Sequence, residues 1–331
     1  MSARGRGPQI LALMMRLPEM PGARLIDDMD EVGISTYVFD TNCRELEALL
    51  LRVEEPEAFW AFTDARKRRA FFQEVTRLLH NAVASARSLR ERTHILTNRW
   101  YADVPEAAAE VKRRQTATFD VPEAQFVQQL RNVMLKARLP PQLIHIAGGR
   151  DQETHQRYIL SREGLLSTAR RRWPSSARSF LENSPEEIHV LPIVQSYRER
   201  VQSYYFWLED HLRQTHARII GEFESAEREY FILELEDRLG GFPKTSRDYP
   251  GRKNPEADVF HGILDESEQD SVRSVPIERR ATLAIRILER KECMSEAIRD
   301  GVRRLYEVVA ADARSAPSGE GAEGAPDSWY E

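Results

Sequence analysis

One predicted helix carries a cluster of side chains suited to phosphate binding: Arg131, Asn132, Lys136 and Arg138. Arginine presents N–H donors in a planar fork, and asparagine offers both a donor and an acceptor. On a helix, Arg131 and Arg138 share one side, and Lys136 lies one turn from Asn132. The spacing therefore predicts a compact polar cluster on a helix whose other side faces a core.

The segment RNVMLK at 131–136 is similar to the R-N-x-x-x-H motif of the HEPN superfamily. The resemblance implies a helical bundle with two long antiparallel helices, in a family of metal-independent ribonucleases and RNA-binding partners of toxins. In that family the arginine and the histidine sit near the 2′-hydroxyl and scissile phosphate, usually across a dimer. Arg131 and Asn132 match the motif, but Lys136 replaces the histidine. A lysine with a pKa of about 10.4 is a poor general base at neutral pH, so the departure argues against catalysis more than against RNA binding.

His80 is a further candidate, because it lies beside the apolar stripe of another helix and could complement Arg131 if the two helices pack. The alternative is a histidine at the core boundary, bonded to a carbonyl oxygen or to water. His94 occupies the equivalent position about 21 Å further on, too far for both histidines to bind one metal. The catalytic residues stay open, with Arg131, Asn132 and His80 as candidates. We expect little or no activity, and any enzyme here would be a metal-independent ribonuclease.

A second cationic run, Arg170 to Arg172, precedes Trp173. Charge beside an aromatic ring suits single-stranded nucleic acid, where phosphate contacts and base stacking act together. The alternative places Trp173 in the core and the arginines in solvent. The side chains predicted to bind nucleic acid are Arg131, Lys136, Arg138, Arg170, Arg171 and Arg172.

The charges are unevenly distributed. Residues 131–180 hold 10 basic and 3 acidic side chains, whereas residues 181–331 hold 20 basic and 31 acidic ones. The basic block either faces an anion such as nucleic acid phosphate or pairs with the acidic helix downstream.

The sequence contains no motif for metal binding, for a phosphate-binding loop or for a membrane span. Cys43 and Cys293 are far apart in the sequence and no Cys/His ligand spacing exists, so we expect no metal and no cofactor. Gly148-Gly149 lacks the Lys-Ser or Lys-Thr of a phosphate-binding loop. No run of about 18 apolar residues predicts a membrane span, and we expect a cytoplasmic protein.

The first element expected to position these residues is a long helix from Asp64 to about Asn98. Its coiled-coil-like stripe has gaps of three and four residues: Phe72, Val75, Leu79, Ala82, Ala86, Leu89, Thr93 and Leu96. The small residues at its centre, Ala82 and Ala86, predict a close crossing by the helix at Tyr197–Leu212 or that at Phe126–Ala137.

A second long helix is predicted from Pro192 to Leu239. Its segment Tyr204–Trp207 is aromatic on all sides, which is typical of a bundle centre or an oligomer contact. Short apolar runs near 143–160 predict a β-hairpin, and Gly33–Phe39 predicts a strand.

We therefore expect a mostly α protein, an antiparallel helical bundle around two long helices with a small β-hairpin. The predicted parts are a poorly ordered arm (1–32), the bundle (33–241), a flexible linker (242–275), C-terminal helices (276–313) and a disordered tail (314–331) ending in an unexplained Trp329-Tyr330. The favoured function is a HEPN-like, RNA-contacting protein. The alternative is a non-enzymatic protein–protein interaction scaffold, with a protein partner or a homo-oligomer formed through Tyr204–Trp207 and the C-terminal helices.

Overall fold

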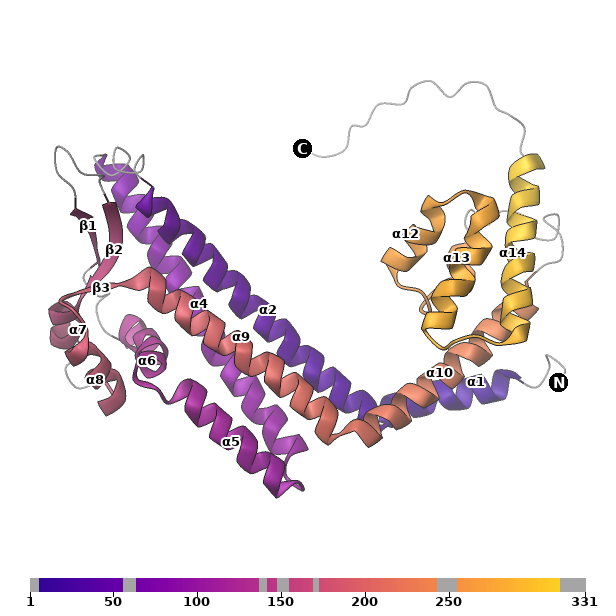
Figure 1. The fold of residues 1–331 in the computed structure, drawn as a ribbon, viewed down its shortest axis with the longest axis horizontal. Coiled ribbons are helices and arrows are strands. Elements are labelled where there is room, and N and C mark those ends of the chain that lie inside the picture. The colour runs from indigo at the N-terminus through magenta and orange to yellow at the C-terminus, as the bar shows by residue number, and fades with distance from the viewer. Residues whose placement is uncertain are drawn as a thin grey trace. The chain divides into compact units, whose positions relative to one another are not determined.

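The computed structural model describes residues 6–55, 64–136, 142–147, 155–168, 173–242 and 255–315 (Figure 1). The prediction of a mostly α fold with antiparallel helices is confirmed, with one small antiparallel sheet. The chain forms two units, one of residues 24–218 and the other of residues 1–23 with 219–331. Within the described ranges, no helix has both the length and the apolarity needed to cross a membrane.

Three long helices build the unit of residues 24–218: α2 (Pro21–Glu54), α4 (Ala65–Trp100) and α9 (Val190–Thr215) (Figure 1). The predicted helix from Asp64 is α4, and the Asp64 carboxylate caps it by accepting the backbone N–H groups of Arg66 and Lys67. Side-chain bonds join the start of α2 to the end of α4, as from Arg99 to Asp28, so these two helices are antiparallel. The antiparallel partner of α4 is thus α2, whereas α9 runs in the same direction as α4.

Two predictions for the N-terminal region are wrong, and both residue ranges are helical instead. The predicted arm at 1–32 carries α1 (Arg6–Arg16), a 3₁₀ turn (Leu17–Glu19) and the start of α2, and the strand predicted at Gly33–Phe39 lies inside α2. The reason is a buried seam with helical spacing, which outweighs the local β-propensity: Leu25, Met29, Val32, Phe39, Cys43, Leu46, Leu50 and Val53.

The small centre of α4 lies next to α6 (Pro122–Lys136), one of the two helices expected to cross there. Ala82 and Ala86 are both buried. A shorter helix, α5 (Pro105–Phe119), packs on α6 and α9.

The predicted hairpin is confirmed, as β1 (Gln142–Ala147) pairs antiparallel with β2 (His155–Ser161). A third strand that the sequence did not predict, β3 (Glu187–His189), pairs with β2. Between them lie α7 (Arg162–Thr168) and α8 (Ser175–Asn183). Trp173 is buried in this region, stacks on Phe126 and donates its indole N–H to the Leu165 carbonyl, which supports its core role.

The predicted helix from Pro192 to Leu239 is in fact two helices, α9 and α10 (Ala217–Gly240), which are separated at His216. The His216 ring lies edge-on to Trp100 and near Tyr101, with ring centroids 5.7 and 5.9 Å away. The Tyr101 hydroxyl bonds to Nδ1 of His211 at 2.6 Å. Contacts between these aromatic and histidine rings thus hold the end of α9 against the end of α4.

This ring cluster predicts a pH dependence. Burial lowers the pKa of both His211 and His216, so below about pH 6.5 the unfolded chain takes up protons before the folded one. The full folding stability is therefore present above that pH, where both histidines are neutral. It is lost as the pH falls through the lowered pKa values that the two histidines have in the folded chain. We expect the melting temperature to fall between about pH 7.5 and 5.5, less steeply in a His211→Gln/His216→Gln variant. An unchanged slope in the double variant would contradict the assignment.

The unit of residues 1–23 and 219–331 has its own core. Besides α1 and α10 it holds α11 (Pro255–Phe260), α12 (Glu266–Ser274), α13 (Ile277–Arg290) and α14 (Glu296–Ser315). The predicted C-terminal helices are α13 and α14. The prediction of a flexible linker at 242–275 is wrong for the part in which α11 and α12 form. Asp265 and Glu268 make a capping box at the start of α12, and Phe260 and Val272 are buried in the core of this unit. The Trp329-Tyr330 pair lies outside the described residues.

Candidate functional site: a groove between α2 and α9

The structure describes only some of the residues that were predicted to contact RNA. Arg131, Asn132 and Lys136 all lie in α6, but the side chains of Arg131 and Lys136 are outside the described part, as are Arg138 and the whole run from Arg170 to Arg172. Their role in nucleic acid binding stays a prediction.

Asn132 is the member of the motif whose side chain is described. It is half-buried, donates to Oε1 of Gln129 at 2.9 Å, and lines a polar cavity of about 750 Å³ between α4, α5 and α6. His94 and Arg90 line the same cavity, whereas the half-buried His80 is not among its lining residues. The structure therefore brings Asn132 together with His94, and it does not place His80 in that cavity.

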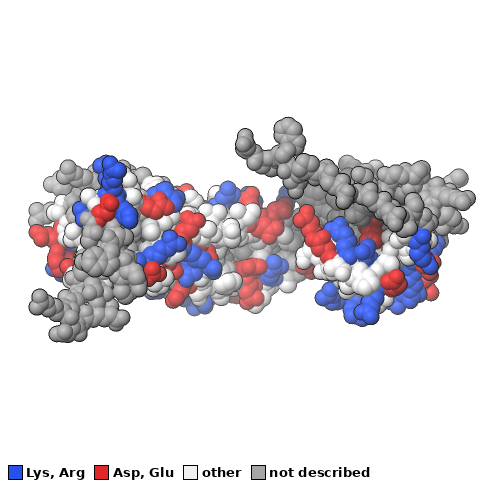
Figure 2. All heavy atoms as spheres, turned by 90° about the horizontal axis from the view of Figure 1, so that it is seen from above, with Lys and Arg blue, Asp and Glu red and all other residues white. Residues whose placement is uncertain are grey.

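The cavity beside Asn132 has a nearly balanced charge. Three cations line it, Arg87, Arg90 and Lys112, together with the carboxylates of Glu91 and Asp120. The Arg87 guanidinium is already bonded to Glu91 at 2.7 Å. Figure 2 likewise shows cationic and anionic side chains interspersed on the face it presents. Among the residues that the structure describes, no group of three or more His, Cys, Asp or Glu side chains could hold a metal ion.

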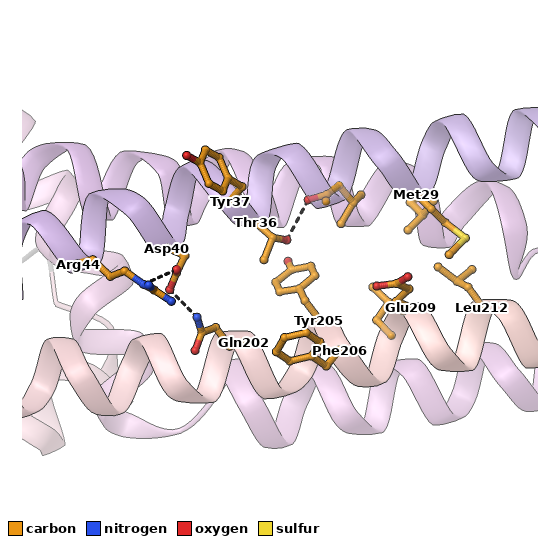
Figure 3. Close-up of a pocket in the computed structure, with 14 residues that line it drawn as sticks. Met29, Thr36, Tyr37, Asp40, Arg44, Gln202, Tyr205, Phe206, Glu209 and Leu212 are labelled. Carbon is orange, nitrogen blue, oxygen red and sulfur yellow. Dashed lines mark hydrogen bonds and ion pairs between the residues drawn. The ribbon is translucent and has the colours of Figure 1, made fainter. Parts of the chain in front are cut away.

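A second hollow lies between α2 and α9, and we call it the α2–α9 groove (Figure 3). Its volume is about 360 Å³. Its lining is Met29, Val32, Gly33, Thr36, Tyr37, Asp40, Arg44, Leu96, Gln202, Tyr205, Phe206, Leu208, Glu209 and Leu212. The α2 residues recur at helical spacing along one side of that helix, so two antiparallel helices form the walls of the groove, and Leu96 comes from α4.

The polar groups in the middle of the groove already have partners. The Thr36 hydroxyl donates to the Val32 carbonyl at 2.9 Å, within its own helix. The Tyr205 hydroxyl bonds to the Thr93 hydroxyl at 2.6 Å, and burial raises the pKa of this tyrosine. The middle of the groove therefore offers a ligand mainly carbon surface.

The rim of the groove exposes large apolar side chains. Phe206 on α9 is 75% exposed and Tyr37 on α2 is 71% exposed, although both line the groove. Ile34 and Val38, the neighbours of Tyr37 on the outer side of α2, are 66% and 45% exposed. Large apolar side chains gathered on two adjacent helices mark an interaction surface more often than single exposed residues do.

One end of the groove is closed by an ionic network. Arg198 donates to Glu47 at 2.7 Å and to Asp40 at 3.2 Å, and Gln202 also donates to Asp40. Arg44 contacts the other oxygen of Asp40 at 2.7 Å. Burial raises the pKa of Glu47, while the Arg198 charge opposes that rise. Arg198 and Gln202 thus tie α9 to Asp40 and Glu47 of α2, while Arg44 pairs with Asp40 within α2.

Sequence reasoning interpreted Tyr204–Trp207 as a bundle centre or an oligomer contact. Within this segment Tyr204 and Tyr205 are buried, whereas Phe206 is exposed at the groove. Sequence reasoning missed the α2 wall because Gly33–Phe39 was interpreted as a strand. The signal that could have found α2 is its buried seam, whose members recur three or four residues apart.

Comparisons with known proteins add no family to this description. No protein-family model, curated protein or solved structure matches the chain.

Proposed function

We propose that this protein is a non-enzymatic interaction module that binds a protein partner through the α2–α9 groove. The observation that supports this most is the exposure of Phe206 and Tyr37 beside an apolar hollow. Burying one such side chain contributes about 1.5–3 kcal/mol, so covering the rim would stabilise a complex.

The RNA-contacting function remains the second proposal, but the described side chains support it less. The cavity beside Asn132 has two carboxylates against three cations, and its Arg87 is already bonded to Glu91, whereas a nucleic acid site needs an excess of cations to replace condensed counterions. The groove, by contrast, carries exposed carbon surface that water solvates poorly.

The test is site-specific photo-crosslinking in cells that express the full chain. A photoreactive phenylalanine analogue replaces Phe206 in one variant and Leu51, a 47% exposed residue of α2 that lines neither the groove nor the cavity beside Asn132, in the control. We expect a discrete protein adduct at position 206, with its partner peptide identified by mass spectrometry, and none at 51. No protein adduct at 206, or the same adducts at both positions, would refute the proposal, and an RNA adduct at 206 would favour the RNA-contacting function instead.

A further inference from the structure

We infer that the partner in the α2–α9 groove is a second copy of this chain, bound about a two-fold axis that passes through the middle of the groove. This inference rests on the proposed function and adds the identity of the partner. Three features of the groove support it, and each concerns self-complementarity.

The first feature is that projecting side chains and a hollow occupy the same surface. A two-fold interface uses one patch on both copies, so that patch must contain both the group that inserts and the space that receives it. Phe206 and Tyr37 project from the rim, and the hollow of about 360 Å³ lies between their helices. A surface that only received a foreign side chain would need the hollow alone.

The second feature is the placement of opposite charges. Arg44 and Glu209 lie on opposite sides of Tyr205 and Phe206 (Figure 3). Figure 3 places Thr36 and Tyr205 level with each other in the middle of the groove. Glu209 is four residues from Tyr205, about 6 Å along α9. The Arg44 side chain reaches back to Asp40, which is four residues from Thr36 and so about 6 Å along α2 in the opposite direction. Because these offsets are equal and opposite, a two-fold rotation about the centre brings Arg44 of each copy to Glu209 of the other.

The third feature is that both charged groups keep unused atoms. Arg44 contacts Asp40 as an ion pair through Nε, and its terminal nitrogens have no hydrogen bond among the described residues. Arg213 donates twice to Oε1 of Glu209, which leaves Oε2 without a bond within the same described part of the chain. The Arg44 side chain is 66% exposed and that of Glu209 is 55% exposed. An ion pair between copies would therefore add bonds without breaking those already present.

The patch is small, because Met29 to Arg44 spans about 22 Å of α2. Interfaces at the small end of the range belong to transient complexes. We therefore expect a reversible dimer whose population rises with concentration. Association must accordingly be measured over a concentration series by sedimentation velocity.

The decisive experiment is a charge exchange on the full-length protein. Arg44→Glu alone and Glu209→Arg alone place like charges together, and each should raise the dimer dissociation constant about tenfold or more. The double variant restores opposite charges across the axis and should regain most of the affinity. Thermal melts of each variant verify that it is folded.

Two apolar substitutions locate the interface. Phe206→Asp should abolish the dimer, whereas Met15→Asp, at a 69% exposed position on α1, should leave it intact. Loss of the dimer in Met15→Asp but not in Phe206→Asp would place the interface on α1 and overturn the inference. So would a double charge variant that stays as weak as the single ones, or a wild-type chain that is monomeric at every concentration. In the last case an adduct at 206 with a different protein would still uphold the proposed function.

Discussion

Replacement of Arg198 by methionine is expected to lower the free energy of unfolding by about 3–5 kcal/mol at neutral pH, because it leaves buried carboxylates without a counter-ion. The Arg198, Asp40 and Glu47 side chains are 18%, 16% and 9% exposed. Methionine keeps the length of the side chain but cannot donate to either carboxylate. The measurement is urea unfolding followed by circular dichroism.

The pH dependence of that loss identifies its cause. Burial already raises the pKa of Glu47, and Arg198 opposes the rise, so removing Arg198 raises it further. A carboxyl group with a raised folded pKa favours folding while it is protonated, and the benefit disappears as the pH rises through that value. The loss in Arg198→Met should therefore shrink as the pH falls from neutral through the raised pKa of Glu47, because this carboxyl group gains its proton there.

Arg44→Met provides the matched control, because Arg44 contacts the same Asp40 from a largely exposed position. An exposed ion pair contributes about 0–1 kcal/mol, so this variant should unfold almost as the wild type does. Equal losses in the two variants, or a loss in Arg198→Met that is independent of pH, would contradict the role given to the buried network.

A second large effect is expected from Gly22→Ala. A Cβ atom at residue 22 would lie 2.4 Å from the Ile219 carbonyl oxygen and 2.5 Å from Cβ of Phe223. The start of α2 thus approaches α10 so closely that a methyl group must displace the backbone. We expect a loss of about 1–3 kcal/mol, despite the better helix propensity of alanine, as measured by chemical unfolding.

Gly221→Ala in α10 isolates the steric cause. A Cβ there has no neighbouring atom within 4 Å, so alanine should stabilise the helix by about 0.5–1 kcal/mol. The two variants make the same chemical change in neighbouring helices of one unit, with opposite expected signs. A gain of stability in Gly22→Ala would show that the close approach of α2 and α10 is wrong.

The elements predicted well are those in which local signals agree. In α4 the capping Asp64, the apolar stripe and the absence of proline all favour one long helix, and its buried residues include Val75, Leu79, Ala82 and Ala86. The hairpin strands are likewise bounded by clear turn residues. Agreement between propensity, pattern and capping is what lets a sequence specify an element.

Where local signals conflict, the sequence alone misleads. Gly33 to Phe39 has the β-branched and aromatic content of a strand, yet Phe39 continues a seam that begins at Leu25 and runs to Val53. Burial of the whole seam against other helices outweighs the preference of seven residues. His216 shows the reverse case, since helical periodicity continues past it while ring contacts to Trp100 and Tyr101 accompany a break in the helix.

The groove could not be predicted from any local pattern. Its walls come from residues 29–44 and 202–212, and a helix pattern states which side is apolar but not which distant helix will cover it. Phe206 lies in an aromatic segment in which every residue looks like core. The packing of α9 against both α2 and α4 decides that Tyr205 is covered and Phe206 is not.

The hydroxyl groups of Thr36 and Tyr205 have a thermodynamic consequence. Since both are bonded within the chain, filling the middle of the groove exchanges water for carbon contacts rather than for new hydrogen bonds. Association dominated by apolar burial has a negative heat-capacity change and weakens on cooling. The groove should therefore hold its occupant less tightly in the cold, the opposite of what a site held by hydrogen bonds would do.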